Sequence, residues 1–239
     1  MALKRVWIPS PNFSSRGGAA VRLIVVHTAE GARTIESLGA FFQGNVEASS
    51  HVGADDKPSV IGEYVKRSDK AWTVANYNPV SVNIELCGFA SWSADEWRND
   101  HANMLKNCAA WIAEEAKYYK IPIQKLSPAA AQGSGRGVCA HSDLGAAGGG
   151  HHDPGPGFPW TFVLEMARAF NLPAKPASAT GEANASVTCH FGRKTGIWEV
   201  HGTKGDVTFG PKDEWEKAEI RVNRKTGAWR IKSTGRSSK

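Results

Sequence analysis

The sequence predicts an α/β domain followed by a small, basic all-β module. Up to residue 170, apolar runs typical of buried strands alternate with stretches of helical periodicity, which predicts strands interleaved with helices. A stretch of small, Pro-containing residues then interrupts this pattern. Beyond it, a six-residue motif occurs twice with one substitution. We therefore expect a domain over residues 1–173, a linker over residues 174–186 and a β module over residues 187–239.

The first half of the α/β domain contains the clearest strand signals. Residues 21–26 form a short, β-branched and nearly continuous apolar run, as expected for a central strand that is buried on both faces. Residues 34–43 predict a helix with Thr34 as its N-cap and Gly44 as its stop. The apolar stripe of this helix consists of Ile35, Leu38, Phe41 and Phe42. Further strands are expected at residues 51–54, 59–65 and 82–86.

Two helices are predicted in the second half of the domain. The first spans residues 93–120 and opens with a capping box between Ser93 and Glu96. Its apolar residues recur at i, i+3 and i+4 spacing, and Pro122 prevents its continuation. The second helix spans residues 160–170 and follows a proline suited to a first turn.

An internal repeat organises the tail. Residues 193–198 (Arg-Lys-Thr-Gly-Ile-Trp) recur as residues 224–229 (Arg-Lys-Thr-Gly-Ala-Trp). Alternating apolar residues flank both copies, and Lys-Thr-Gly between two such runs is typical of a β-hairpin, because Gly readily adopts the positive φ of a tight turn. The repeat therefore predicts two hairpins of one module, but it does not indicate what the module binds.

The composition excludes a membrane protein. The 239 residues are 41% hydrophobic and 22% charged, which is typical of a soluble globular protein. No apolar run approaches the roughly 20 residues of a bilayer-spanning helix. No apolar segment follows the early positive charges, so we expect no conventional secretory signal. The scattered cysteines predict buried free thiols in a reducing compartment, at Cys87, Cys108, Cys139 and Cys189.

The excess positive charge lies in the tail. Residues 1–173 carry 16 Lys and Arg against 16 Asp and Glu. Residues 174–239 carry 13 against 7, which accounts for the whole net charge of +6. A basic module beside a neutral domain indicates an anionic partner for the tail.

Three polar residues occupy chemically suggestive positions. His27 follows directly on the buried run at residues 21–26, and the carboxyl end of a central strand is where α/β sheets open their clefts. His141 also follows apolar residues, and the Gly-rich residues 145–150 would let Asp153 fold back onto it. Two imidazoles and a carboxylate could form a catalytic zinc site, because three protein ligands leave a fourth position for water. The same loop could equally be a flexible surface segment.

Five motifs, in this order along the chain, resemble one family of enzymes. They are residues 25–28 (Val-Val-His-Thr), 69–73 (Asp-Lys-Ala-Trp-Thr), 82–86 (Val-Asn-Ile-Glu-Leu), 140–144 (Ala-His-Ser-Asp-Leu) and 151–160 (His-His-Asp-Pro-Gly-Pro-Gly-Phe-Pro-Trp). Together they resemble the zinc-dependent N-acetylmuramoyl-L-alanine amidases, or type 2 amidases, which are related to peptidoglycan recognition proteins. The likeness covers residues 20–170 and is greatest to the amidase domains of bacteriophage endolysins. It implies a central, mostly mixed β-sheet flanked by helices, one zinc ion per chain, and hydrolysis of the amide bond between N-acetylmuramic acid and L-alanine.

The resemblance also implies roles for individual residues. The family's zinc ligands fall on His27, His141 and Asp153. The residue that stabilises the transition state, two positions before the third ligand, falls on His151. The family's general base is either a Tyr or the Glu of a Gly-Ile-Glu-like motif. Because Ser50 stands at the Tyr position, the resemblance assigns this role to Glu85.

Other positions near the expected site are less defined. Side chains alternate along an extended loop, so we expect His152 to point away from the side that His151 and Asp153 share. Trp72 is expected to line the substrate groove, whereas His51 either contacts substrate or packs behind the site. The sequence departs from the family pattern at three positions. Thr73 stands where His is usual, and Asn83 and Ala140 stand where Gly is usual.

Alternative functions follow from the same features. A non-catalytic peptidoglycan-binding protein or an amidase that recycles soluble muropeptides could have this fold, although the binding proteins typically lack the third ligand. In the tail, Lys and Arg would attract the phosphate- or carboxylate-bearing polymers of bacterial walls. Nucleic-acid binding, with tail tryptophans stacked on bases, is less favoured. We expect a peptidoglycan hydrolase without a membrane partner, made in a host cytoplasm and acting on the wall after release.

Overall fold

The computed structural model describes residues 2–172, 187–192, 197–201, 215–222 and 229–236. The chain divides into two compact units, Met1–Lys175 and Pro176–Lys239. The linker expected over residues 174–186 lies outside the described residues. Within the described part, no helix is both long and apolar enough to cross a membrane.

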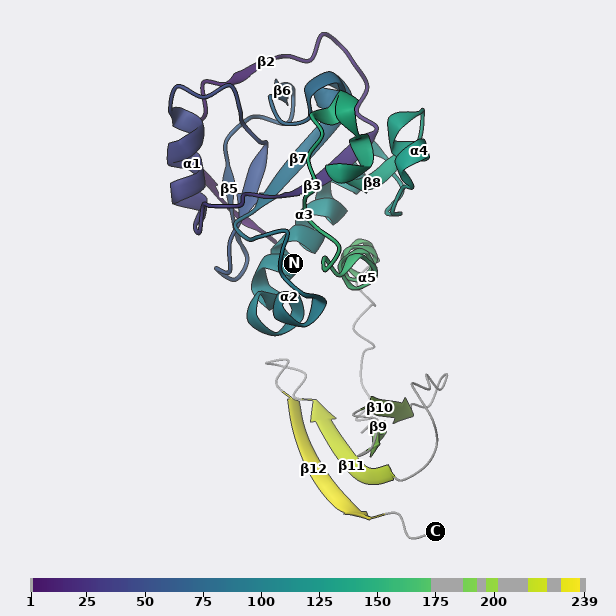
Figure 1. The fold of residues 1–239 in the computed structure, drawn as a ribbon. Helices are drawn as coiled ribbons and strands as arrows, with labels where there is room; N and C mark the ends of the chain where they lie inside the picture. Colours follow the sequence, from purple (N-terminus) through teal and green to yellow (C-terminus); the bar gives the residue numbers. More distant parts are fainter. Residues whose placement is uncertain (1, 173–186, 193–196, 202–214, 223–228, 237–239) are drawn as a thin grey trace, which may run out of the picture. The chain divides into compact units, whose positions relative to one another are not determined.

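A six-stranded mixed β-sheet forms the centre of the N-terminal unit (Figure 1). In spatial order its strands are β1 (Lys4–Trp7), β5 (Val60–Glu63), β4 (Val52–Ala54), β7 (Ser81–Leu86), β3 (Leu23–Thr28) and β8 (Gly137–Ala140). The strands β4, β7, β3 and β8 are mutually parallel, whereas β5 runs antiparallel to β4 and pairs in parallel with the edge strand β1. Two short strands, β2 (Phe13–Ser15) and β6 (Asp69–Ala71), form a separate antiparallel pair. The expected mixed sheet is therefore confirmed.

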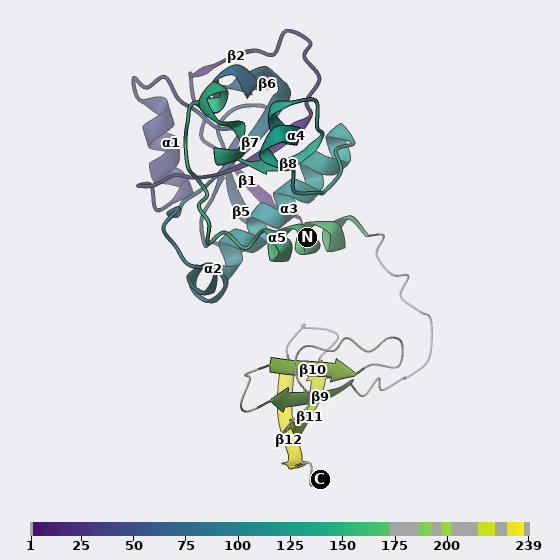
Figure 2. The ribbon, with the colours of Figure 1, turned by 45° about the vertical axis from the view of Figure 1, so that its right-hand side comes forward.

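Long helices cover one face of this sheet. Figures 1 and 2 show α3 (Ala102–Tyr119) and α5 (Trp160–Asn171) packed against each other below the strands, with α2 (Ala94–Asp100) nearby. Alternate residues of β3, Ile24 and Val26, join the main hydrophobic cluster with the apolar residues of these helices. Trp97 and Trp111 are the largest side chains buried in it. Burying one large apolar side chain contributes about 1.5–3 kcal/mol, so this face supplies much of the stability.

Shorter elements cover the opposite face. Leu23 and Val25, the other alternate residues of β3, pack in a second cluster. The surrounding elements are α4 (Pro128–Gln132) and the 3₁₀ helices η1 (Ala75–Val80), η2 (Ser142–Leu144) and η3 (Ala146–Gly148). The helix α1 (Ile35–Gln43) contacts β4 and β5. Because side chains alternate along a strand, His27 is the next residue of β3 after Val25 whose side chain lies on this face.

The single helix expected over residues 93–120 is in fact two helices, α2 and α3, separated at His101. The imidazole of His101 stacks on Trp92 with ring centroids 3.7 Å apart. Its Nδ1 lies 2.6 Å from Oδ2 of Asp56, whose other oxygen accepts a hydrogen bond from the Met104 N–H. Asp56 therefore caps α3 from a distant part of the chain. The expected capping box is also only half formed, because Ser93 Oγ accepts from the Glu96 N–H without a reciprocal bond.

The other helix predictions need smaller changes. Thr34 and Gly44 cap α1 as expected, and a capping box between Thr34 and Ser37 was not anticipated. Phe41 was expected on the buried stripe but is 53% exposed. Three cysteines are buried free thiols, as predicted, at Cys87, Cys108 and Cys139.

The C-terminal unit is a four-stranded antiparallel sheet in the order β10–β9–β11–β12 (Figure 2). The strands are β9 (Val187–Gly192), β10 (Ile197–His201), β11 (Trp215–Val222) and β12 (Trp229–Arg236). β9 pairs with β10 and β11 pairs with β12, so antiparallel strands flank both copies of the repeat, as the two hairpins require. The expected Lys-Thr-Gly turns lie outside the described residues.

Candidate active site

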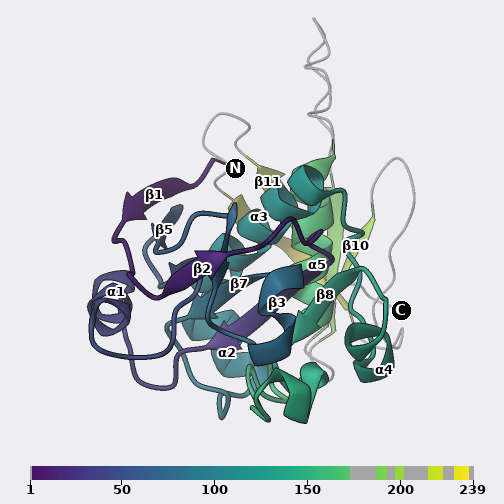
Figure 3. The same cartoon turned by 90° about the horizontal axis from the view of Figure 1, so that it is seen from above.

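The register of three neighbouring strands brings predicted site residues to one edge of the sheet. His27 on β3 pairs with Glu85 on β7, so the two side chains lie side by side on the same face. Val26 pairs with Ala140, the last residue of β8, and His141 follows directly. Figure 3, seen from above, shows β7, β3 and β8 as adjacent strands. His27 itself belongs to β3, which extends two residues beyond the expected run.

The loop after β8 brings Asp153 to the same place. The backbone carbonyl of Asp153 accepts a hydrogen bond from the Ser142 N–H at 3.1 Å, so the loop folds back beside His141. Its Oδ2 accepts from the Thr28 N–H at 3.3 Å. Gly155 has a φ of +84°, and any Cβ at this position would overlap the carbonyl of Ala90. Only glycine allows the loop to approach this closely.

Three buried side chains converge here, and together they could hold a metal ion: His27, His141 and Asp153. The Nδ1 atoms of the two imidazoles are 3.0 Å apart. His27 Nδ1 lies 3.2 Å from Oδ2 of Asp153, and His141 Nδ1 lies 3.3 Å from Oδ1. The side chains of all three residues are at most 6% exposed. The potential ligand atoms, one from each residue, all lie within 4.8 Å of one another.

The electrostatics of this group suit a cation. Burial lowers the pKa of His27, which favours the neutral ring that binds metals. Burial alone would raise the pKa of Asp153, but the imidazoles of His141 and His27 beside its carboxylate outweigh this effect and hold that pKa below its usual range. The site therefore presents a carboxylate beside nitrogen lone pairs, and such a group is strongly stabilised by positive charge.

The donor set fits zinc. Nε2 of His141 lies 2.8 Å from the Gly148 carbonyl oxygen, which can only accept a hydrogen bond. In the neutral ring Nε2 therefore carries the hydrogen, and Nδ1 is left with its lone pair. Zinc bonds to His nitrogen and carboxylate oxygen at about 2.0–2.2 Å in a tetrahedral arrangement, which separates ligand atoms by about 3.3–3.5 Å. The observed separations of 3.0–3.3 Å are close to this spacing.

Glu85 stands beside the metal-ligand group. Its Oε1 lies 3.8 Å from Nδ1 of His27, and its side chain is 14% exposed. Burial, followed by the negative charges of Asp153 and Glu30, raises the pKa of Glu85 well above the usual value for glutamate. Its carboxylate is therefore a stronger base than that of a solvent-exposed glutamate.

His151 and His152 are both exposed in the loop that carries Asp153. The ring of His151 stacks on that of His141, with centroids 4.3 Å apart and an interplanar angle of 13°. Its Nδ1 lies 3.9 Å from Oδ1 of Asp153. His151 is thus next to the ligand group and open to solvent, whereas the expectation that His152 is not catalytic stays a prediction.

The two residues expected at the substrate groove differ in their surroundings. Trp72 is half-buried, and its indole Nε1 donates to Ser14 Oγ at 3.0 Å. His51 is only 2% exposed, and its Nδ1 accepts a hydrogen bond from the Asn83 N–H at 3.1 Å. Its position therefore does not support direct contact with substrate, and the alternative of packing behind the site fits better.

Two contacts at the ligand group were not anticipated from the sequence. The Gly148 carbonyl binds Nε2 of His141, and Asn83 Oδ1 lies 3.1 Å from Nε2 of His27. Asn83 precedes Glu85 by two positions, so strand alternation could have placed both on one face. The contact itself depends on the register between β3 and β7, which no local pattern reveals.

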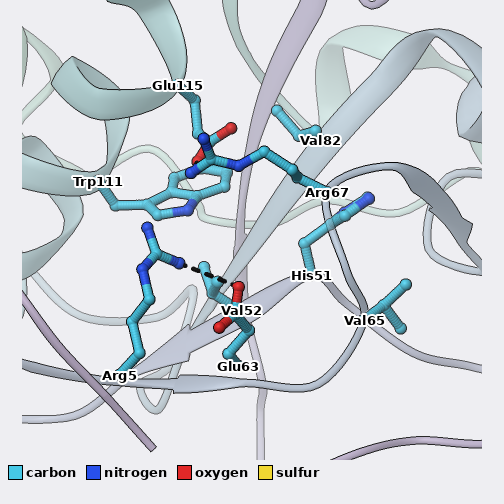
Figure 4. A pocket seen from close by; sticks show the side chains of 9 residues that line it. All are labelled: Arg5, His51, Val52, Glu63, Val65, Arg67, Val82, Trp111 and Glu115. Carbon is cyan, nitrogen blue, oxygen red and sulfur yellow. Dashed lines mark hydrogen bonds and ion pairs between the residues drawn. The ribbon is translucent and has the colours of Figure 1, made fainter. Parts of the chain in front are cut away.

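A second group of charged residues lies between the sheet and α3, apart from this site (Figure 4). Arg5 pairs with Glu63 at 3.3 Å, and Arg67 pairs with Glu115 at 2.6 Å. His51 also lines this small pocket.

By fold and site, the N-terminal unit is an α/β protein that gathers two histidines and a carboxylate at the carboxyl edge of a mixed sheet. A sequence profile described as N-acetylmuramoyl-L-alanine amidase matches residues 17–156, and the chain belongs to this family. It is accordingly a peptidoglycan hydrolase that cleaves the amide bond between N-acetylmuramic acid and L-alanine. The fold and enzyme class expected from the motifs are confirmed.

Solved structures support the fold. Hydrolase AmiA of Staphylococcus aureus, determined in complex with its ligand, is 20% identical with a TM-score of 0.57 over 72% of this chain and 85% of that chain. PlyL is 16% identical with a TM-score of 0.50 over 72% of this chain and 100% of its own. The PlyG catalytic domain is also 16% identical, with a TM-score of 0.50 over 73% and 98%. No curated protein sequence matches the chain significantly.

Proposed function

We propose that the amidase reaction of this chain depends on one zinc ion held by His27, His141 and Asp153. The observation that carries the proposal is the convergence of these three buried side chains, with donor atoms 3.0–3.3 Å apart. When bound by three protein ligands, zinc lowers the pKa of a water molecule to about 7 and polarises a carbonyl oxygen.

Glu85 moves the proton in this proposal. Its carboxylate lies within 3.8 Å of a ligand nitrogen, and its burial favours proton uptake. It takes a proton from the attacking water and later gives that proton to the leaving nitrogen of L-alanine. The amine then departs as a neutral group, which is a far better leaving group than an amide anion.

His151 stabilises the charge that develops on the carbonyl oxygen. It is exposed beside His141 and can turn an N–H toward a substrate in the open part of the site. A hydrogen bond that strengthens as negative charge builds on oxygen lowers the barrier selectively. We also expect the half-buried Trp72 to offer an aromatic surface to the substrate.

The tail and the cellular setting complete the proposal. The 13 Lys and Arg of residues 174–239 against 7 Asp and Glu would hold the enzyme on anionic polymers of a cell wall. Together with the endolysin-like motifs, this favours a bacteriophage lysin that is made in the host cytoplasm and acts on the wall after release.

Digestion of purified sacculi tests the reaction. The wild-type chain should release fragments with new L-alanine amino termini and should contain one zinc ion per chain. Glu85→Gln should lose about 10²–10⁴-fold in rate while keeping its zinc, because it lacks only the base. Glu165→Gln, an exposed change on α5, is the matched control and should keep full activity. Cleavage between sugars or within the stem peptide, or zinc binding without product, would contradict the proposal.

A further inference from the structure

A fully buried asparagine contacts one proposed metal ligand at the ring nitrogen that does not face the metal site. Asn83 on β7 is 0% exposed, and its Oδ1 lies 3.1 Å from Nε2 of His27. It stands two residues before Glu85 on the strand that pairs with β3. The opposite ring nitrogen of His27, Nδ1, faces His141 and Asp153.

The Asn83 side chain has a partner at each end of its amide. Its Nδ2 donates to Ser81 Oγ at 3.1 Å, and its Oδ1 is the atom that faces His27. The contact with His27 is therefore made by an acceptor.

The backbone of Asn83 is fixed as well. Its N–H donates to Nδ1 of His51 at 3.1 Å, and Nε2 of His51 lies 3.1 Å from the Asp69 carbonyl oxygen. Burial and then the charge of Arg16 lower the pKa of His51 to about 3, so this ring is neutral. A neutral ring that accepts at Nδ1 carries its hydrogen on Nε2, which faces the Asp69 carbonyl oxygen; Nη2 of Arg16 also lies 3.1 Å from this nitrogen.

We propose that Asn83 is a positioning residue that holds His27 in the Nε2–H tautomer and aims its Nδ1 lone pair at the metal. An amide oxygen only accepts, so the facing nitrogen must carry the hydrogen. The lone pair on Nδ1 of His27 is then available to the metal ion. The inference rests on the proposed zinc site and assigns a role to a residue at which this sequence departs from the family pattern.

His141 provides an internal parallel. Its Nε2 faces the Gly148 carbonyl, which is likewise only an acceptor, and its Nδ1 faces the same ligand group. Both imidazoles are thus tethered at Nε2, one by main chain and one by a side chain. Outer partners of this kind typically contribute about 10–100-fold to metal affinity. The side-chain tether on His27 is the one that substitution can remove.

Two variants separate positioning from simple filling of the space. Asn83→Leu keeps a similar volume and removes the acceptor, whereas Asn83→Asp keeps an acceptor oxygen at the same atom. Zinc affinity of the full chain, measured by competition with a chromophoric chelator, should fall about 10–100-fold in Asn83→Leu. It should stay within about threefold of wild type, or tighten, in Asn83→Asp. Equal affinity of folded Asn83→Leu and wild type would overturn the inference.

Asn107→Leu is the matched control. Asn107 on α3 is also 0% exposed, and its Nδ2 contacts the carbonyls of Asp55, Lys57 and Val60 rather than the ligand group. It should lose stability without losing zinc affinity. If it lost affinity equally, the effect of Asn83→Leu would be a general consequence of lost stability, and the inference would fail.

The tautomer of His27 can also be measured by spectroscopy on the wild-type chain, so this test does not depend on whether a variant folds. Long-range ¹H–¹⁵N correlation of the metal-free wild-type chain should give His27 the pattern of a neutral Nε2–H ring. An Nδ1–H pattern would refute the positioning role. The outcomes also separate the two proposals. A wild-type chain that binds no zinc contradicts the proposed function. The tautomer of His27 still tests whether Asn83 positions this ring.

Discussion

The buried carboxyl group of Glu115 should make the stability of the N-terminal unit depend on pH. Glu115 lies on α3 with its side chain 2% exposed, and its Oε1 contacts Arg67 at 2.6 Å (Figure 4). Its Oε2 is buried and has no hydrogen-bond partner among the described residues. Burial raises the pKa of Glu115 to about 7, although Arg67 and Arg5 partly oppose this rise.

The sign and size of the effect follow from this pKa. An unfolded chain releases the proton near pH 4.5, whereas the folded chain retains it to about pH 7. The stabilising contribution is thus fully present below pH 4.5 and is lost as pH rises to 7. Each pH unit in this window lowers the free energy of unfolding by about 1.4 kcal/mol, which gives about 3 kcal/mol in total.

Urea unfolding of wild type and Glu115→Gln, each with chelator present, measures this contribution. The amide does not titrate, so the variant's free energy of unfolding minus that of wild type should rise by about 3 kcal/mol between pH 4.5 and pH 8. Groups common to both chains cancel in the difference. A difference that stays constant across this range would refute the reasoning.

Three further predictions concern the site. Removing zinc with a chelator should lower the melting temperature, because zinc at 100 times its Kd adds about 2.7 kcal/mol to the free energy of unfolding. Gly155→Ala should weaken zinc binding and lower the melting temperature, because the added Cβ would overlap the Ala90 carbonyl. Gly31→Ala is the control and should change neither, because the space around Gly31 is open. His151→Ala should reduce kcat about 10²–10³-fold, while its zinc content, measured by mass spectrometry, stays unchanged. His152→Ala is the control and should leave kcat unaltered. Loss of zinc from His151→Ala would contradict the role assigned to His151.

The sequence predicted those features that depend on local pattern. The apolar run at residues 21–26, which His27 follows, was recognisable because a buried strand has a distinctive composition. Thr34 was recognisable as a cap because its hydroxyl bonds within the same turn. The Gly-rich residues before Asp153 indicated a fold-back because few other residues permit one.

Features that depend on distant contacts were missed. The break at His101 requires Asp56, which caps the second helix from another loop. The contact between Asn83 and His27 requires a strand register that only the folded sheet defines. Phe41 has helical spacing to its apolar neighbours yet faces solvent, because only part of the predicted stripe meets the sheet. In each case a tertiary partner decides what the local pattern leaves open.

The order of the ligands along the chain has a consequence for biosynthesis. A nascent polypeptide that has left the ribosome only through β7 carries His27 but neither of the other two proposed ligands. His141 and Asp153 follow β8, near the end of the N-terminal unit. Metal binding that needs a folded site adds its free energy only when that site exists. Ion capture would therefore mark the completion of this unit, and partial translation products would remain without the catalytic ion.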